Sequence, residues 1–96
     1  MLRLEWTTPA ADQLEHAQDY YHGLNPKAAT LMAMRIVEAA HLLCEQPGMG
    51  RPGRVTGTRE WMVPRTPYLL VYRAQGEALE VLHVWHEAKD WASCFE

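Results

Sequence analysis

The sequence predicts an α+β domain in the order β-α-α-β-β-β, with a helical hairpin packed on a small, mainly antiparallel sheet. From Gly57 to Trp91, three strand-length apolar runs are separated by two turn signals, a pattern typical of a β-meander. Before this stretch, two segments with apolar residues at helical spacing are separated by only a short turn. A chain of 96 residues has room for one modest core, so we expect residues 1–96 to form a single domain.

The three runs of the meander are defined by the residues that interrupt them. Trp61–Val63 is followed by Pro64–Pro67, whose two prolines lack backbone N–H groups and break a ladder. Tyr68–Arg73 resumes with aromatic and aliphatic residues, and Ala74–Glu77 supplies a short turn containing glycine. Leu79–Trp85 is the third run. The three runs therefore predict three consecutive antiparallel strands.

Strand periodicity assigns the side chains of the third run to two faces. A period of two predicts one face with Leu79, Val81, His83 and Trp85, and another with Glu80, Leu82, Val84 and His86. Both faces are mixed, which favours a sheet that is covered on one side and partly solvated on the other. The two histidines are three residues apart, so we expect them to point to opposite faces.

The N-terminal segment predicts a fourth strand and the first helix. Leu2–Trp6 alternates apolar and charged residues, so we expect a strand that joins the meander with Leu2, Leu4 and Trp6 facing inward. Thr8 and Pro9 then predict an N-cap and a first helical position. The helix should end at Gly23, in a left-handed conformation. Its buried stripe should be Ala10, Leu14, Ala17 and Tyr21, with Gln13, Glu15, Asp19 and His22 mostly solvated.

A second helix is predicted to run back along the first. Asn25 and Pro26 repeat the signal of a cap followed by proline, and helical periodicity continues from Lys27 to Glu45. The predicted buried positions are Leu31, Met32, Ile36, Ala39, Ala40 and Leu43. Met32 and Met34 fit core and flanking positions, and methionine also suits a surface that receives a partner helix. Pro47–Arg54 is rich in glycine and proline, so we expect it to be a loop.

The charge of the chain is unevenly distributed. The net charge of −3 argues against a protein that binds nucleic acid through its overall charge. Between Gln46 and Gly76, however, Arg51, Arg54, Arg59, Arg65 and Arg73 face a single acid, Glu60. This predicts a local basic surface. It is either a binding surface or a set of solvated arginines, with Arg59 in a local ion pair with Glu60.

The sequence contains no pattern for a metal, a cofactor or a membrane span. Cys44 and Cys94 show neither CxxC spacing nor histidines at zinc-ligand intervals, so we expect two reduced thiols and no cofactor. No apolar run approaches the ~20 residues that cross a bilayer, and no signal pattern begins the chain. These features predict a cytoplasmic protein that does not contact the membrane.

Three pieces of the sequence, in this order and spacing, resemble the ParE/RelE superfamily of type II toxin–antitoxin toxins. They are Gly57–Glu60, Pro67–Arg73 and Val81–His86. With the two N-terminal helices and the link at Gln46–Arg51, the likeness covers nearly the whole chain. The resemblance implies a toxin that is neutralised by a cognate antitoxin, in a hetero-oligomer with it.

Two activities of the superfamily are distinguished by one position. RelE-like ribonucleases often carry a Tyr-Arg-Leu-Val-Tyr segment whose arginine contacts the scissile phosphate, and Leu69 occupies the matching position here. This departure favours the ParE-like branch, which poisons DNA gyrase without a catalytic site. The alternative is a ribosome-dependent mRNA endonuclease acting on ribosome-bound mRNA, with Arg59, Arg73, Tyr72 and His86 as candidate catalytic residues. A third reading is a degenerate toxin that retains only antitoxin binding.

Partner contacts are predicted on both parts of the fold. A two-helix layer covers only part of a four-stranded sheet, so apolar surface should remain for an amphipathic helix and an extended segment of the antitoxin. The predicted antitoxin-binding residues are Leu14, Tyr21, Met32 and Met34, and the predicted target-binding residues are Arg59, Arg65 and Arg73.

Overall fold

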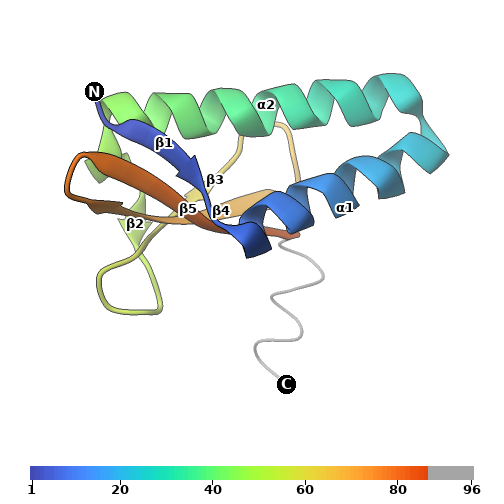
Figure 1. Cartoon of the computed structure of the whole chain (residues 1–96). Coiled ribbons are helices and arrows are strands. Elements are labelled where there is room, and N and C mark those ends of the chain that lie inside the picture. The colour runs from blue at the N-terminus through green and yellow to red at the C-terminus, as the bar shows by residue number, and fades with distance from the viewer. Residues whose placement is uncertain (87–96) are drawn as a thin grey trace.

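The structure is a computed structural model, and it describes residues 1–86; Trp91 and Cys94 therefore lie outside the described residues. Two helices lie on one side of a five-stranded sheet (Figure 1). The elements in chain order are β1 (Arg3–Trp6), α1 (Thr8–Leu24), α2 (Pro26–Glu45), the 3₁₀ turn η1 (Pro47–Met49), β2 (Arg51–Pro52), β3 (Arg59–Met62), β4 (Tyr68–Gln75) and β5 (Ala78–His86). The predicted α+β class and the helical hairpin are confirmed.

The sheet contains one strand more than the sequence predicts. Its order is β1-β5-β4-β3-β2, with β1 parallel to β5 and the other neighbours antiparallel. The extra strand, β2, lies in the segment expected to be a loop, where Arg51 pairs with Glu60 and Pro52 with Arg59. Proline is tolerated there because β2 is an edge strand and needs bonds on one side only. The prediction of a loop was wrong at these two residues.

The first helix begins one residue earlier than predicted. Thr7, not Thr8, is the N-cap, and its Oγ1 accepts a hydrogen bond from the backbone N–H of Ala10 at 3.4 Å. The same hydroxyl donates to the carbonyl of Val81 at 2.9 Å. Either threonine could cap a helix by local sequence, but this contact with β5 favours Thr7. The helix start is thereby fixed to the sheet.

A single residue makes the turn between the two helices. Gly23 remains helical and has no positive φ, so the predicted left-handed end at Gly23 was wrong. Asn25 is extended, with φ −162° and ψ 105°, and its N–H donates to the carbonyl of Tyr21. Its side chain accepts hydrogen bonds from the N–H groups of Lys27 and Ala28. Asn25 therefore ends α1 and caps α2, which confirms the predicted start of the second helix.

The core lies between the helices and the sheet. Its fully buried members come from both layers, for example Ile36 and Leu43 from α2 and Leu70 and Leu79 from the sheet. The predicted inward residues of β1, Leu2, Leu4 and Trp6, pack against this core. Leu31 is 46% exposed, so its predicted burial was wrong. Among residues 1–86, no helix is both long and apolar enough to cross a bilayer.

A β-bulge changes the predicted faces of β5. Tyr72 pairs with Val81 and Val71 pairs with His83, which leaves Leu82 without a partner on β4. The alternation therefore reverses after Val81, and Val81 and Val84 both enter the core although they are three residues apart. The prediction that Val81 and His83 lie on the same face of the strand was therefore wrong. His83 and His86 both follow the bulge, and the odd spacing keeps them on opposite faces.

The hydroxyl of Tyr72 joins the sheet to the end of α2. This residue is fully buried in β4. Its hydroxyl accepts a hydrogen bond of 2.9 Å from the N–H of Gly50 and donates one of 2.7 Å to the carbonyl of Pro47. Arg59 adds a bond of 2.8 Å to the carbonyl of Gly50. A Cβ at Gly50 would lie 2.5 Å from the Tyr72 oxygen and 2.9 Å from the carbonyl oxygen of Glu60, so this position requires glycine.

Replacing Gly50 by alanine should destabilise the fold by about 1–3 kcal/mol, because the added methyl must displace the Tyr72 hydroxyl or the β3 backbone. Thermal unfolding of the two proteins measures this as a fall in Tm of at least about 4 °C for a domain of this size. The matched control is Gly48→Ala, where the added Cβ has no neighbour within 4 Å. Equal unfolding midpoints for the Gly50→Ala protein and wild type would contradict the conclusion that position 50 requires glycine.

Candidate functional site

The arginine-rich segment contains a buried acid. Glu60 is only 4% exposed, and its carboxylate lies 3.4 Å from nitrogens of both Arg51 and Arg54. It also accepts a hydrogen bond of 3.1 Å from the backbone N–H of Arg54. The guanidinium of Arg54 lies 5.5 Å from the ring centroid of Trp85. The buried carboxylate of Glu60 therefore neutralises part of the predicted basic surface. Its contacts with Arg51 and Arg54 also hold the loop that follows β2 against the sheet.

The three predicted target-binding arginines differ in their environments. One reading of the sequence predicted an ion pair between Arg59 and Glu60. In the structure the Arg59 guanidinium instead donates a hydrogen bond to the carbonyl of Gly50. Arg73 donates to Glu80 on the neighbouring strand at 2.7 Å. Arg65 is exposed, in the turn before β4, with an unusual φ of +63°. The three side chains come from β3, from the turn between β3 and β4, and from β4, and all three residues are exposed.

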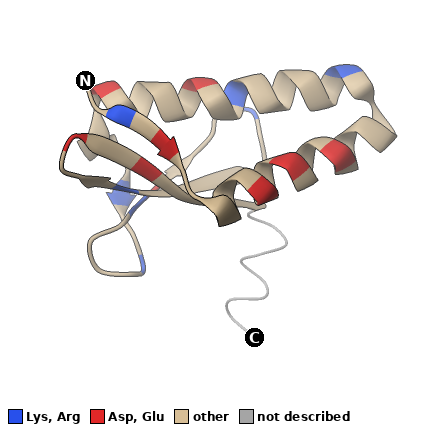
Figure 2. Cartoon of the chain, viewed as in Figure 1, with Lys and Arg blue, Asp and Glu red and all other residues tan. Residues whose placement is uncertain are grey.

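Sequence analysis missed a fourth arginine, Arg35, on α2. Its Nη1 donates to the backbone carbonyl of Arg65 at 3.2 Å, so the two residues are neighbours although they are thirty positions apart. Figure 2 shows basic residues over the β2–β3 side of the molecule and acidic ones along α1, where Asp12, Glu15 and Asp19 are exposed. Helical periodicity of α2 alone gave no signal for Arg35, because its contact is with a turn outside the helix.

The four candidate ribonuclease residues are not assembled in one place. Tyr72 is fully buried, and burial raises the pKa of its phenol against the smaller opposing effects of the Gly50 hydrogen bond and the Arg59 charge. Arg73 is bonded to Glu80 near the β4–β5 turn, whereas His86 pairs with Tyr68 at the opposite end of the same hairpin. Five residues of strand separate Tyr68 from Arg73, about 17 Å. One phosphate cannot contact His86 and Arg73 together.

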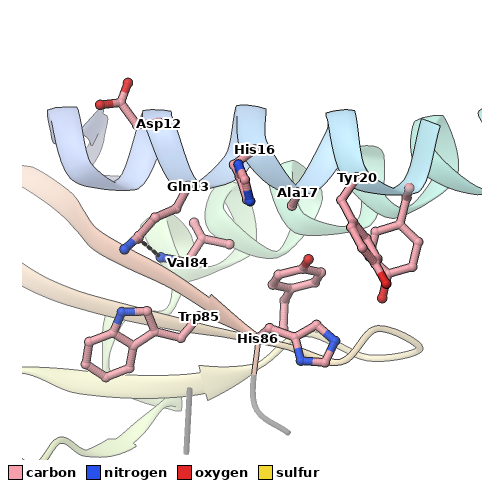
Figure 3. Close-up of a pocket in the computed structure, with 10 residues that line it drawn as sticks. Asp12, Gln13, His16, Ala17, Tyr20, Val84, Trp85 and His86 are labelled. Carbon is pink, nitrogen blue, oxygen red and sulfur yellow. Dashed lines mark hydrogen bonds between the residues drawn. The ribbon is translucent and has the colours of Figure 1, made fainter. Parts of the chain in front are cut away.

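His86 instead contributes to a cavity of about 610 Å³ between α1 and the ends of β4 and β5. Figure 3 shows its side chains converging from the helix and the strands. Its lining is Asp12, Gln13, His16, Ala17, Tyr20, Tyr21, Tyr68, Val84, Trp85 and His86. These residues offer hydroxyl and imidazole groups, and the described lining contains no lysine or arginine. The only side chains of this lining that can carry the positive charge needed beside a phosphate are the two histidines.

Gln13 has a structural role that sequence analysis missed. It was expected to be solvated, but its Oε1 accepts a hydrogen bond of 2.8 Å from the N–H of Val84, drawn as a dashed line in Figure 3. Its Nε2 lies 3.4 Å from Nδ1 of His83. Burial lowers the pKa of His83, which stacks on Trp85. Gln13 therefore covers the edge of β5 beyond the end of β1.

Leu69 and Cys44 are both inaccessible. Leu69, at the position where RelE-like ribonucleases carry arginine, is fully buried in β4. Cys44 is 1% exposed, and burial raises the pKa of its thiol. Within residues 1–86, no group of three or more His, Cys, Asp or Glu is placed to hold a metal ion.

The outer surface of the helical hairpin carries two shallow apolar grooves. One of about 630 Å³ is lined by Trp6, Ala11, Leu14, Glu15, Gln18, Asp19 and Val37, and the other, of about 430 Å³, by Gln18, Thr30, Ala33, Met34, Val37 and Glu38. Gln18 and Val37 border both grooves, so the two adjoin. Met34 is 53% exposed here, and Leu14 lines the first groove.

The four predicted antitoxin-binding residues are thus only partly brought together. Leu14 and Met34 lie on the grooved outer surface, and Tyr21 lines the cavity of Figure 3. Met32 is 6% exposed and belongs to the core, as its helical spacing predicted, so its side chain is not part of the grooved surface. The two methionines differ because they are two positions apart on a helix and point to different sides.

Comparison with known proteins identifies the family. The model of the ParE toxin of the type II toxin–antitoxin system parDE matches residues 4–91. A relative named "Putative toxin Y4kP" from Sinorhizobium fredii is 36% identical over 89 residues, which cover 93% of this chain and 92% of the relative. Toxin RelE2 of Caulobacter vibrioides is 32% identical over 89 residues, 93% of this chain and 99% of that protein.

A solved structure agrees with these relatives. The chromosomal ParDE toxin–antitoxin system from P. aeruginosa matches with a TM-score of 0.81 and 31% identity, covering 90% of this chain and 96% of that one. The match confirms the fold of two helices on a mixed sheet. The chain therefore belongs to the ParE family of type II toxin–antitoxin toxins.

Proposed function

We propose that this toxin inhibits DNA gyrase by binding it and that a cognate antitoxin neutralises the toxin. The observation that carries the gyrase assignment is the dispersal of the candidate ribonuclease residues. Tyr72 is fully buried, Arg73 is bonded to Glu80, and His86 lies at the far end of the β4–β5 hairpin. A protein that inhibits its target by binding does not need these side chains to meet around one phosphate group. Because gyrase acts on DNA in the cytoplasm, we propose a cytoplasmic location for the toxin.

The competing function is ribosome-dependent cleavage of mRNA. The relative named Toxin RelE2 is the observation in its favour. Against it, Leu69 provides no charge at the position of the phosphate-binding arginine, and it is fully buried. Stabilising the charge that develops on a phosphorane is most of what a metal-free ribonuclease must do, so the loss of that arginine is costly. A third alternative, a degenerate toxin that only binds its antitoxin, would lack both activities.

We infer that the antitoxin binds the grooved outer surface of the helical hairpin. Leu14, Val37 and Met34 supply apolar contacts along both helices, as an amphipathic helix laid across them would require. The acidic residues of α1 flank this surface and favour a partner helix with basic residues beside its apolar stripe. β1 is an edge strand next to the same surface, and an extended segment of the antitoxin can pair with it.

Target contact is assigned to Arg65. Of the three predicted arginines, Arg59 is held by the carbonyl of Gly50 and Arg73 by the carboxylate of Glu80. Substituting Arg59 would therefore disturb the backbone at Gly50, and substituting Arg73 would remove a surface ion pair. Arg65 lies in the turn before β4, next to Arg35 of α2, and borders neither of the two grooves on the helical hairpin.

Purified toxin should inhibit DNA supercoiling by purified gyrase, because binding alone suffices to block the enzyme cycle. The measurement is the amount of supercoiled plasmid formed at increasing toxin concentration, with ribosome-bound mRNA assayed in parallel. Addition of the antitoxin, expressed from the neighbouring reading frame, should restore supercoiling. The gyrase assignment would be rejected by unaffected supercoiling together with mRNA cuts positioned by codon.

Replacing Met34 by glutamate should weaken the toxin–antitoxin complex about ten-fold or more, since a charge would enter the apolar interface, a change of at least ~1.4 kcal/mol. Titration calorimetry with the antitoxin measures the change. The control is Val55→Glu, which places the same charge on another exposed apolar residue, in the loop between β2 and β3. Equal affinities for the two variants would show that the antitoxin binds elsewhere.

A further inference from the structure

We propose that Arg35 and Arg65 form a carboxylate-binding site, and that the apolar cavity beside them holds a neighbouring side chain of the same partner segment. The ligand is an acidic segment of a partner protein that also carries an apolar residue. The inference extends the target-binding role proposed for Arg65, and it rests on that proposed function only for the identity of the partner.

The site lies between α2 and the turn that joins β3 to β4. A cavity of about 310 Å³ is bordered by Arg35, Glu38, Ala39, Leu42, Trp61, Pro64 and Arg65. The hydrogen bond from Arg35 to the carbonyl of Arg65 fixes the distance between helix and turn. Both arginines therefore border the same cavity, and the long side chain of the exposed Arg65 can bring its guanidinium to a carboxylate that Arg35 also contacts.

The charge of these two arginines is not compensated within the described residues. Arg51 and Arg54 share Glu60, and Arg73 pairs with Glu80, but no described carboxylate lies within 4.0 Å of Arg35 or Arg65. Glu38 lines the cavity without pairing with either. Two arginines at one cavity attract an external anion, and arginine binds a carboxylate through two parallel hydrogen bonds.

The rest of the cavity selects for an apolar neighbour. Leu42 is 38% exposed, and Ala39, Pro64 and the ring of Trp61 complete an apolar wall. Nε1 of Trp61 is buried and has no acceptor among the described residues. An acidic side chain followed or preceded by leucine supplies a carboxylate, an apolar group and backbone acceptors together.

A protein segment fits this site better than nucleic acid does. Glu38 borders the cavity, and its negative charge repels a run of phosphates more strongly than it repels a single carboxylate. The full chain has a net charge of −3, which opposes the approach of a polyanion. A peptide brings one negative charge and an apolar side chain, matching the pair of cations and the wall beside them.

The test is a titration of the ¹⁵N-labelled full chain, followed by NMR, with the peptide acetyl-Leu-Asp-Leu-amide. Its matched control is the same peptide with asparagine in place of aspartate. The aspartate peptide should shift the Trp61 indole signal, identified with Trp61→Phe, and the Nε signals of Arg35 and Arg65. Titration to about 20 mM detects a site with a dissociation constant in the millimolar range. The asparagine peptide should bind at least ten-fold more weakly.

Two variants connect the shifts to the proposed residues. The double variant Arg35→Gln and Arg65→Asn should abolish the response; asparagine is chosen because it tolerates the positive φ of Arg65. Arg73→Gln, which removes an arginine already paired with Glu80, should keep it. The proposal is overturned if the aspartate peptide produces no shift, if both peptides produce equal shifts, or if inorganic phosphate produces the same shifts at the same concentration. None of these outcomes depends on gyrase, so they are distinct from a failed supercoiling assay.

Discussion

The hydrogen bonds of the Tyr72 hydroxyl determine how the two layers of this fold are connected. The residue lies in β4, a central strand, and its hydroxyl contacts both Pro47, just after α2, and Gly50, just before β2. The absence of a side chain at Gly50 permits this approach. The short edge strand β2, the position of Arg59 and the entry into the arginine-rich loop all depend on it. A polar group of the core therefore orders the most highly charged part of the chain.

This arrangement explains why residues suited to RNA chemistry do not form a catalytic site. Tyr72 is required inside the core, and Arg59 is bonded to the backbone that Tyr72 positions. His83 and His86 are three residues apart on β5, which keeps them on opposite faces. Accessible surface remains at the outer grooves of the helices and at the turn that carries Arg65. Both are suited to binding proteins, one through apolar side chains and the other through charge.

The sequence predicted the class, the helical hairpin and four of the five strands, because periodicity and caps are local properties. It could not predict the bulge at Leu82, since an unpaired residue in β5 is defined by its register against β4. The choice of Thr7 over Thr8 depends on the carbonyl of Val81, seventy-four positions away. Arg35 was missed for the same reason: its partner, Arg65, is in a distant turn. Met32 and Met34 were grouped by residue type, which does not reveal the side of the helix.

The most direct test of the claim that Tyr72 is structural rather than catalytic is the growth inhibition produced by a Tyr72→Phe toxin. The variant leaves the Gly50 N–H and the Pro47 carbonyl without their partner and should lose about 1–3 kcal/mol of stability. At a temperature where circular dichroism shows it folded and calorimetry shows that it still binds the antitoxin, we predict growth inhibition equal to that of wild type. Loss of inhibition by this folded, antitoxin-binding protein would contradict the account and identify Tyr72 as a participant in chemistry.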